Sequence, residues 1–128
     1  MERHHVSSGS PWEQPVGFSR AVRMGAHVYV SGTTGTDAQG LVPNHDAYAQ
    51  AKLALTRIAE ALEHAGASMR DVVRTRMYVT DIAQWQAVGR AHAEAFADVR
   101  PATTMVEVRR LIAPDILVEI EADAVTAG

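Results

Sequence analysis

The last apolar run of the chain, residues 116–125, alternates between two kinds of side chain, and this pattern constrains the fold more than any other. One set of positions is apolar and consists of Ile116, Val118, Ile120, Ala122 and Ala124. The alternate positions hold Leu117, Glu119, Glu121 and Asp123. Because successive side chains of a strand point to opposite faces, the pattern predicts a strand with one apolar and one acidic face. Three carboxylates are costly to bury alone, so the acidic face must meet water, cations or a partner that supplies them.

Composition limits the classes of protein to which the chain can belong. Its 128 residues suit one domain, which we expect to span residues 1–128, and 47% hydrophobic residues are enough for a core. The net charge is -3 and no basic run exceeds Arg109-Arg110, which argues against nucleic-acid binding. There is no cysteine, and neither a signal peptide nor an apolar run of about 20 residues is apparent. We therefore expect a cytoplasmic protein that binds no membrane.

The remaining segments predict further strands and two helices. Strands are expected at residues 3–6, 18–24, 27–33, 72–79 and 100–111, ahead of the closing strand at 117–125. Residues 46–65 and 81–97 predict helices. The first helix has one apolar stripe with helical spacing, formed by Ala51, Ala54, Leu55, Ile58, Leu62 and Ala65. The order β-β-β-α-β-α-β-β predicts an α+β fold in which both helices cover one face of a mixed sheet.

The other face of this sheet is expected to be polar. It would carry Arg74, Arg76, Glu107, Arg109, Glu119, Glu121 and Asp123. Opposite charges on neighbouring strands can pair, each pair contributing roughly 0.2–1 kcal/mol. Such a face is either solvated or shared with sister subunits, which favours an oligomer.

Several familiar kinds of site are not supported by the residues. The glycine-rich stretch from Gly32 to Gly40 lacks the Gly-Lys-Ser/Thr ending of a phosphate-binding loop, so a plain turn is favoured. The six histidines show no metal-binding spacing, and no serine-hydrolase elbow or dinucleotide fingerprint is present. Trp12 fits a plug over the core better than a ligand contact, and His92 fits a core or interface histidine better than a catalyst. We expect no metal and no cofactor.

Four segments in order resemble the RidA/YjgF family, also called the Rid or L-PSP endoribonuclease-like family. They are Val30-Ser-Gly32, residues 74–82, Arg100-Pro-Ala-Thr-Thr, and residues 117–122, within a similarity from about Gly17 to Val125. The resemblance implies the chorismate-mutase-like form of the predicted fold. It also implies a homotrimer in which the sheets form a central barrel and small-molecule clefts lie between subunits.

The same resemblance implies which residues form the cleft. Deaminases of the family hydrolyse enamine and imine acids such as 2-aminoacrylate, with a glutamate that handles water, and Glu119 matches this glutamate. Ser31 and Gly32 match the serine and glycine of the cleft. Phe18 stands where the family has tyrosine, and Thr103 stands where it has the arginine that grips the substrate carboxylate.

The threonine at position 103 predicts a change of substrate. Threonine offers one neutral hydroxyl in place of two charge-assisted hydrogen bonds, and the loss of one partner of a buried charge pair commonly costs about 2–5 kcal/mol. We therefore expect activity on 2-aminoacrylate to be weak or absent, with no sequence reason to place Arg20, Arg109 or Arg110 at the carboxylate. The residues expected around Glu119 form an apolar pocket suited to a neutral or cationic ligand, namely Trp12, Phe18, Trp85, Thr103, Thr104 and Met105.

Three functions remain open at this point. The first is hydrolysis of an imine, enamine or related metabolite other than 2-aminoacrylate by Glu119. The second is a non-catalytic metabolite-binding module. The third, a ribonuclease, is the weakest because the chain has a negative net charge and no basic groove.

Overall fold

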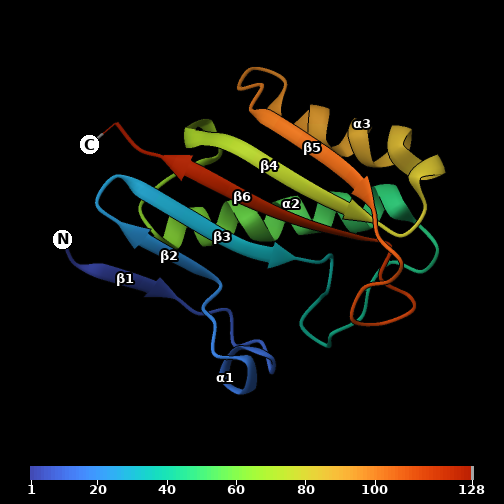
Figure 1. The fold of residues 1–128 in the computed structure, drawn as a ribbon, viewed down its shortest axis with the longest axis horizontal. Helices are drawn as coiled ribbons and strands as arrows, with labels where there is room; N and C mark the ends of the chain where they lie inside the picture. The colour runs from blue at the N-terminus through green and yellow to red at the C-terminus, as the bar shows by residue number, and fades with distance from the viewer. Residues whose placement is uncertain (128) are drawn as a thin grey trace.

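The protein folds into one six-stranded mixed sheet with two helices packed against one face (Figure 1). A computed structural model describes residues 1–127. The strands are β1 (Arg3–Val6), β2 (Ala21–Met24), β3 (His27–Thr33), β4 (Val72–Val79), β5 (Ala102–Glu107) and β6 (Val118–Val125). The helices are α1 (Glu13–Val16), α2 (Ala47–His64) and α3 (Trp85–Phe96), with 3-10 turns η1 (Met69–Asp71) and η2 (Ile82–Gln84). The α+β prediction is confirmed, whereas the trimeric barrel stays a prediction.

The closing strand lies near the middle of the sheet, whose order is β1-β2-β3-β6-β4-β5. Strand β6 pairs antiparallel with both β3 and β4, and β4 pairs parallel with β5. The alternation predicted for β6 is confirmed, because Val118, Ile120, Ala122 and Ala124 are at most 1% exposed and Glu119 lies on the other face. This central position explains why its apolar face is completely covered.

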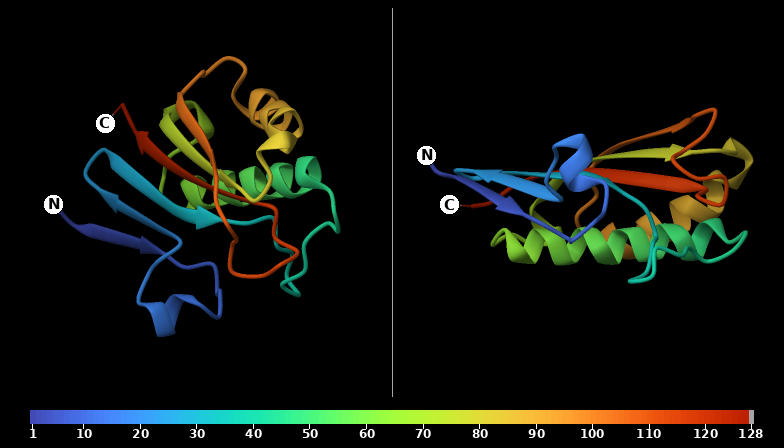
Figure 2. Two further views of the ribbon diagram at one scale, coloured as in Figure 1. Left: turned by 45° about the vertical axis from the view of Figure 1, so that its right-hand side comes forward. Right: turned by 90° about the horizontal axis from the view of Figure 1, so that it is seen from below.

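Helix α2 covers the sheet as its apolar stripe predicts (Figure 2). The side chain of Asp46 accepts a hydrogen bond from the amide of Ala49 and caps the first turn. The helix ends before Gly66, which adopts a positive φ of 76° that suits glycine. Ile58 and Leu62 are fully buried against the sheet. Local pattern and tertiary packing therefore agree over the whole of α2.

Two details of the predicted helix and strand faces are wrong. In the second helix the spacing of Trp85, Val88, His92 and Phe96 predicts one shared stripe. Trp85 is nevertheless 55% exposed, because it is the first residue of α3 and burial begins one turn later, at Val88. Strict alternation along residues 72–79 predicts Val73 on the face opposite Arg74 and Arg76, yet Val73 is exposed while Val72 is buried. The pairing of β4 with β6 shifts register between Val72 and Arg74, and such a shift reverses the faces.

The observed bounds of three segments differ from the bounds predicted from the sequence. The stretch predicted as a loop before Gly17 contains the one-turn helix α1, which ends at this glycine with a φ of 84°. The next strand begins at Ala21 instead of Phe18. The strand predicted at residues 100–111 is shorter, Ala102–Glu107, and Arg100 before it has a φ of 51°.

A buried glutamine ties three segments together, which leads to a prediction about stability. The Gln50 side chain donates to the carbonyl oxygens of Pro43 and Asp115 and accepts from the amide of Leu117. Gln50→Ala leaves these buried groups unpaired, so we expect the free energy of unfolding to fall by about 2–4 kcal/mol. Urea denaturation measures the change. Gln86→Ala, at an exposed position of α3, is the control, and equal small losses in both variants would contradict the role of Gln50.

Candidate functional site

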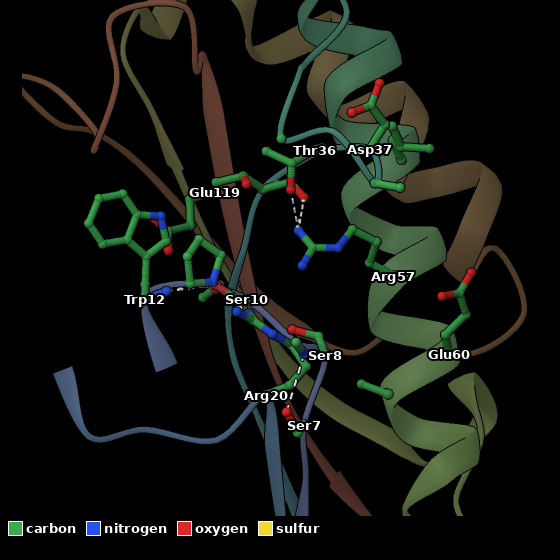
Figure 3. Close-up of a pocket in the computed structure, with 18 of the residues that line it drawn as sticks. Ser7, Ser8, Ser10, Trp12, Arg20, Thr36, Asp37, Arg57, Glu60 and Glu119 are labelled. Carbon is green, nitrogen blue, oxygen red and sulfur yellow. Dashed lines mark hydrogen bonds between the residues drawn. The ribbon is translucent and has the colours of Figure 1, made fainter. Parts of the chain in front are cut away.

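A groove of about 990 Å³ lies between the N-terminal loop, the end of β3 and one side of α2. Residues 6–12 form one wall, and Arg57, Glu60 and His64 of α2 contribute to the other. Figure 3 shows Trp12 and the serines of the N-terminal loop facing α2 across this space. Of the site and pocket residues predicted from the sequence, Trp12, Phe18, Gly32 and Glu119 line the groove.

Glu119 and Gly32 are held against each other by the sheet. The pairing of β3 with β6 is irregular between Val30 and Thr33, which places Gly32 beside the Glu119 carboxyl group. A Cβ atom on Gly32 would overlap this carboxyl group, so the contact requires glycine. Burial raises the pKa of Glu119, an effect that the charge of Arg20 opposes and that of Glu121 reinforces. The result is a half-buried carboxyl group that takes up a proton more readily than an exposed one.

Ser31 plays a structural part in this arrangement. Its hydroxyl donates to the carbonyl oxygen of Ser19 at 2.6 Å, and its amide donates to the carbonyl oxygen of Arg20 at 2.9 Å. Both bonds tie the bulged end of β3 to the entry of β2. The hydroxyl proton is therefore already engaged, which argues against Ser31 as a nucleophile.

Arg20 is a residue of the groove that the sequence did not identify. Its side chain is only 6% exposed, and Nη1 donates to the carbonyl oxygen of Gly32 at 2.7 Å and to Oγ1 of Thr33 at 3.0 Å. The guanidinium also lies 5.4 Å from the ring centroid of Phe18. A single arginine beside an aromatic residue at the start of a predicted strand was the only sequence signal.

A second arginine lines the same groove from α2. Nη1 of Arg57 donates to the carbonyl oxygen of Thr34 at 2.7 Å and to Oγ1 of Thr36 at 2.8 Å. The groove of one chain is therefore not an apolar pocket with one acid, because two guanidinium groups accompany Glu119 in it, and Asp37 and Glu60 also line it. The apolar pocket expected between subunits stays a prediction. Figure 3 shows Arg20, Arg57 and Glu119 around the same space.

The N-terminal wall of the groove is organised by one carboxylate. Glu13 accepts hydrogen bonds from the hydroxyls of Ser7 and Ser8 and from the amides of Ser8 and Ser10. Partial burial raises the pKa of Glu13, but the hydrogen bonds from the three serines outweigh it, so the net pKa is below its ordinary value. Trp12 is 53% exposed and does not plug the core, but it lines the groove near Glu119, which was the other place expected for it.

The other predicted site residues lie elsewhere in the chain. Thr103 pairs with Thr75 in the β4–β5 register, and its hydroxyl is 2.8 Å from that of Thr75 and 3.4 Å from Nε2 of His92. Burial lowers the pKa of His92. Trp85 stands on α3, while Thr104 and Met105 continue β5. None of these lines the groove, so one chain does not bring them to Glu119, and their place in a shared cleft stays a prediction.

The acidic face of β6 is paired with residues of β4, as the sequence predicted. The hydroxyl of Tyr78 donates to Glu121 at 2.5 Å, and Nη1 of Arg76 lies 3.3 Å from Asp123. Within residues 1–127 there is no cluster of three or more His, Asp or Glu side chains that could hold a metal ion. The same part of the chain contains no helix with the length and hydropathy needed to cross a membrane.

Comparisons with known proteins identify the family. The model of the family described as endoribonuclease L-PSP matches residues 12–126. A crystal structure of Rv2704 from Mycobacterium tuberculosis, a member of the YjgF/YER057c/UK114 family, is 56% identical and superimposes with a TM-score of 0.90 over 98% of this chain and all of that one.

Two relatives extend this comparison. The uncharacterised protein SCO2049 of Streptomyces coelicolor is 42% identical over 93% of this chain and 89% of its own. The 3-aminoacrylate deaminase RutC of Acinetobacter baylyi is 38% identical over 73% of this chain and 74% of its own. The family match, the sequence identity and the shared sheet topology lead to one conclusion: the chain belongs to the RidA/YjgF family, the endoribonuclease L-PSP family of the matching model.

Proposed function

We propose that the groove hydrolyses a small imine or enamine to a carbonyl compound and ammonia, with Glu119 as the group that handles water. The observation that carries this proposal is the half-buried Glu119 carboxyl group, held against Gly32 in a groove and given a raised pKa by burial. A general base acts best when its pKa lies near the working pH, and burial moves a carboxyl group in that direction. The 3-aminoacrylate deaminase among the relatives supports this class of reaction.

The proposed steps need only water and Glu119. Water adds to the carbon of the protonated imine, and the Glu119 carboxylate takes one proton from this water as the C–O bond forms. Glu119 then returns the proton to nitrogen, and the C–N bond breaks as the carbonyl forms. The hydroxyl proton leaves with ammonia as ammonium, so one iminium ion and one water give one carbonyl compound and one ammonium ion. An enamine enters the same path after protonation of its β-carbon.

Thr103 separates this reaction from that of the family's 2-aminoacrylate deaminases. Its side chain is uncharged and cannot replace the guanidinium, and its hydroxyl already lies 2.8 Å from that of Thr75. We propose a substrate other than 2-aminoacrylate. The same observation favours a second candidate, a non-catalytic module that captures a metabolite in the groove.

The site is proposed to be completed in a cytoplasmic homotrimer. Half-exposed Tyr29 and the ion pair of Arg76 with Asp123 occupy the sheet face that no helix covers, and a sister subunit can bury them. We expect light scattering at micromolar concentration to give three times the mass of the chain. A monomer would contradict both the trimer and a cleft shared between subunits.

A deamination assay tests the proposed reaction. Imines generated in situ by an amino-acid oxidase react with semicarbazide, and an active protein hydrolyses them first. We expect less semicarbazone and faster release of ammonia for at least one imine of a broad panel. If no imine or enamine in the panel is hydrolysed while one of the carbonyl products binds, the binding module is the correct function.

The raised pKa of Glu119 predicts the pH dependence of this reaction. The base form is the carboxylate, so kcat/KM rises with pH as Glu119 ionises. Because burial raises the pKa of this group, the acidic limb is expected at higher pH than for an ordinary exposed carboxyl group. Ammonia release followed over a range of pH measures the limb. A limb at the ordinary carboxyl value would show that Glu119 is not the titrating base.

A further inference from the structure

Only one of the three nitrogens of the Arg20 guanidinium, Nη1, forms hydrogen bonds within residues 1–127. Both protons of Nη1 are directed to acceptors, the carbonyl oxygen of Gly32 and Oγ1 of Thr33. Nε is buried without a hydrogen-bond partner, and Nη2 donates no hydrogen bond to any residue of the described chain, 1–127. In a planar guanidinium the Nε and Nη2 protons on this edge are parallel, which is the pair of donors that binds a carboxylate bidentately.

A buried donor without a partner calls for an explanation. Most buried polar groups are hydrogen-bonded, and leaving a charged one unpaired is costly. The ring of Phe18 lies over the guanidinium and adds to its burial, with 5.4 Å to the ring centroid. Since Arg20 lines the groove, an anion bound there would supply the missing acceptors.

The charges around Arg20 favour an anion as well. Burial lowers the pKa of Arg20, and the positive charge of Arg57 lowers it further, while Glu13 and Glu119 act in the opposite sense. Glu13 is engaged by three serine residues, and Glu119 forms no ion pair with either arginine among residues 1–127. Two arginines thus share the groove without an acid bonded to either of them among residues 1–127.

We propose that Arg20 is a specificity-determining residue that binds a carboxylate of the substrate through Nε and Nη2. This inference rests on the proposed function and assigns the carboxylate anchor of its substrate: an imine or enamine acid other than 2-aminoacrylate, whose carboxylate reaches Arg20 instead of the position of Thr103. The cation comes from the segment before β2, in the same chain as Glu119, and not from the position of Thr103 on β5. The ligand is therefore an anion, in contrast to the neutral or cationic ligand expected from the sequence.

The position of Arg20 also fixes where the reacting carbon lies. Nη1 is anchored on the carbonyl oxygen of Gly32, and the Glu119 carboxyl group packs against the same glycine. Gly32 thus sets the spacing between the carboxylate-binding edge and the acid that handles water. A substrate held by Arg20 presents its C–N bond to Glu119 at a distance set by the backbone of β3.

Binding of carbonyl products tests the inference without any turnover. The probes are 2-oxobutyrate and 3-oxobutyrate, each compared with its neutral amide by calorimetry or NMR titration on the full chain. We expect wild type to bind at least one acid about 30-fold or more tightly than its amide. Arg20→Gln should reduce this preference to about twofold or less. Arg20→Lys keeps a charge without the two parallel donors and should fall between the two.

Arg23→Gln is the matched control. Arg23 belongs to the same hairpin and also holds backbone carbonyl oxygens, those of Gly25, Ala65 and Gly66, but it does not line the groove. Its variant should keep the preference for the acid. If Arg20→Gln does not fold, the test compares the acid preference of wild type with that of Arg20→Lys.

The outcomes separate this inference from the proposed reaction. Equal binding of acid and amide by wild type, or an unchanged preference in Arg20→Gln, would overturn the role of Arg20. Failure of wild type to bind any of the probes would overturn it too. Wild type could also prefer the acids through Arg20 but hydrolyse no imine. This result would contradict the proposed reaction and would still support the carboxylate site.

Discussion

Glu119→Gln is expected to lower kcat/KM for imine hydrolysis by at least about 100-fold, the lower range of effects for removal of a general base. Glutamine keeps the size and a hydrogen-bonding group but cannot accept the proton of the attacking water. The fold should survive, because Glu119 is half-buried in a groove and its neighbour Gly32 tolerates an amide of the same shape. Ammonia release on the best imine of the panel measures the loss, and thermal denaturation checks the fold.

Glu121→Gln is the control for this experiment. Glu121 lies two residues further along β6 on the same face, and it accepts a hydrogen bond from Tyr78, which glutamine can also accept. We expect its kcat/KM to stay within about threefold of wild type at a pH above the acidic limb, because Glu121 does not line the groove. Light scattering checks that the assembly is unchanged. Equal activity of the Glu119 and Glu121 variants would remove Glu119 from the reaction.

Gly32→Ala is expected to lower kcat/KM by about 100-fold through the displacement of Glu119. The added Cβ would overlap the Glu119 carboxyl group, so the carboxyl group has to move away from its position in the groove. A displacement of about 1 Å at a reacting group can cost on the order of 100-fold in rate. Kinetics of this variant should show a loss mainly in kcat, because the carboxylate-binding edge of Arg20 lies on the other side of its guanidinium from Gly32.

Gly89→Ala provides the matched control for the glycine variant. Gly89 lies in α3, and an added Cβ there would meet no atom within 4 Å. The change should leave activity unaltered and raise stability slightly, since alanine favours a helix by about 1 kcal/mol over glycine. If Gly32→Ala were as active as Gly89→Ala, the position of Glu119 would not depend on Gly32.

Much of the fold could be predicted because its signals are local. The alternation along β6 and the helical stripe of α2 each report on a single element, and both elements are buried as their patterns indicate. Local signals failed where pairing between distant strands intervened. The exposure of Val73 follows from a register shift against β6, a strand about 45 residues further along the chain, so no window around Val73 contains that information.

The candidate site was predictable only in part. Resemblance to a family singled out Glu119, Gly32 and Phe18, and these three residues line the groove. The same resemblance drew attention to Thr103 as a missing cation, yet Thr103 bonds to Thr75 and lies apart from Glu119 within one chain. Residues taken from four positions of a motif pattern need not meet in one subunit.

The sequence by itself determined the order of the elements, the amphipathic faces of α2 and β6, and the acid of the groove. These features depend on residues that lie close together in the sequence, as periodic patterns and motifs do. Only the tertiary structure decided the charge of the groove. Arg20 and Arg57 are 37 positions apart, one just before β2 and the other on α2. Arg20 is oriented by acceptors at the end of β3, and Arg57 by acceptors on the segment that follows β3. These acceptors lie at and after the register shift between Val30 and Thr33, which depends on the pairing of β3 with β6 and so on residues distant in the sequence.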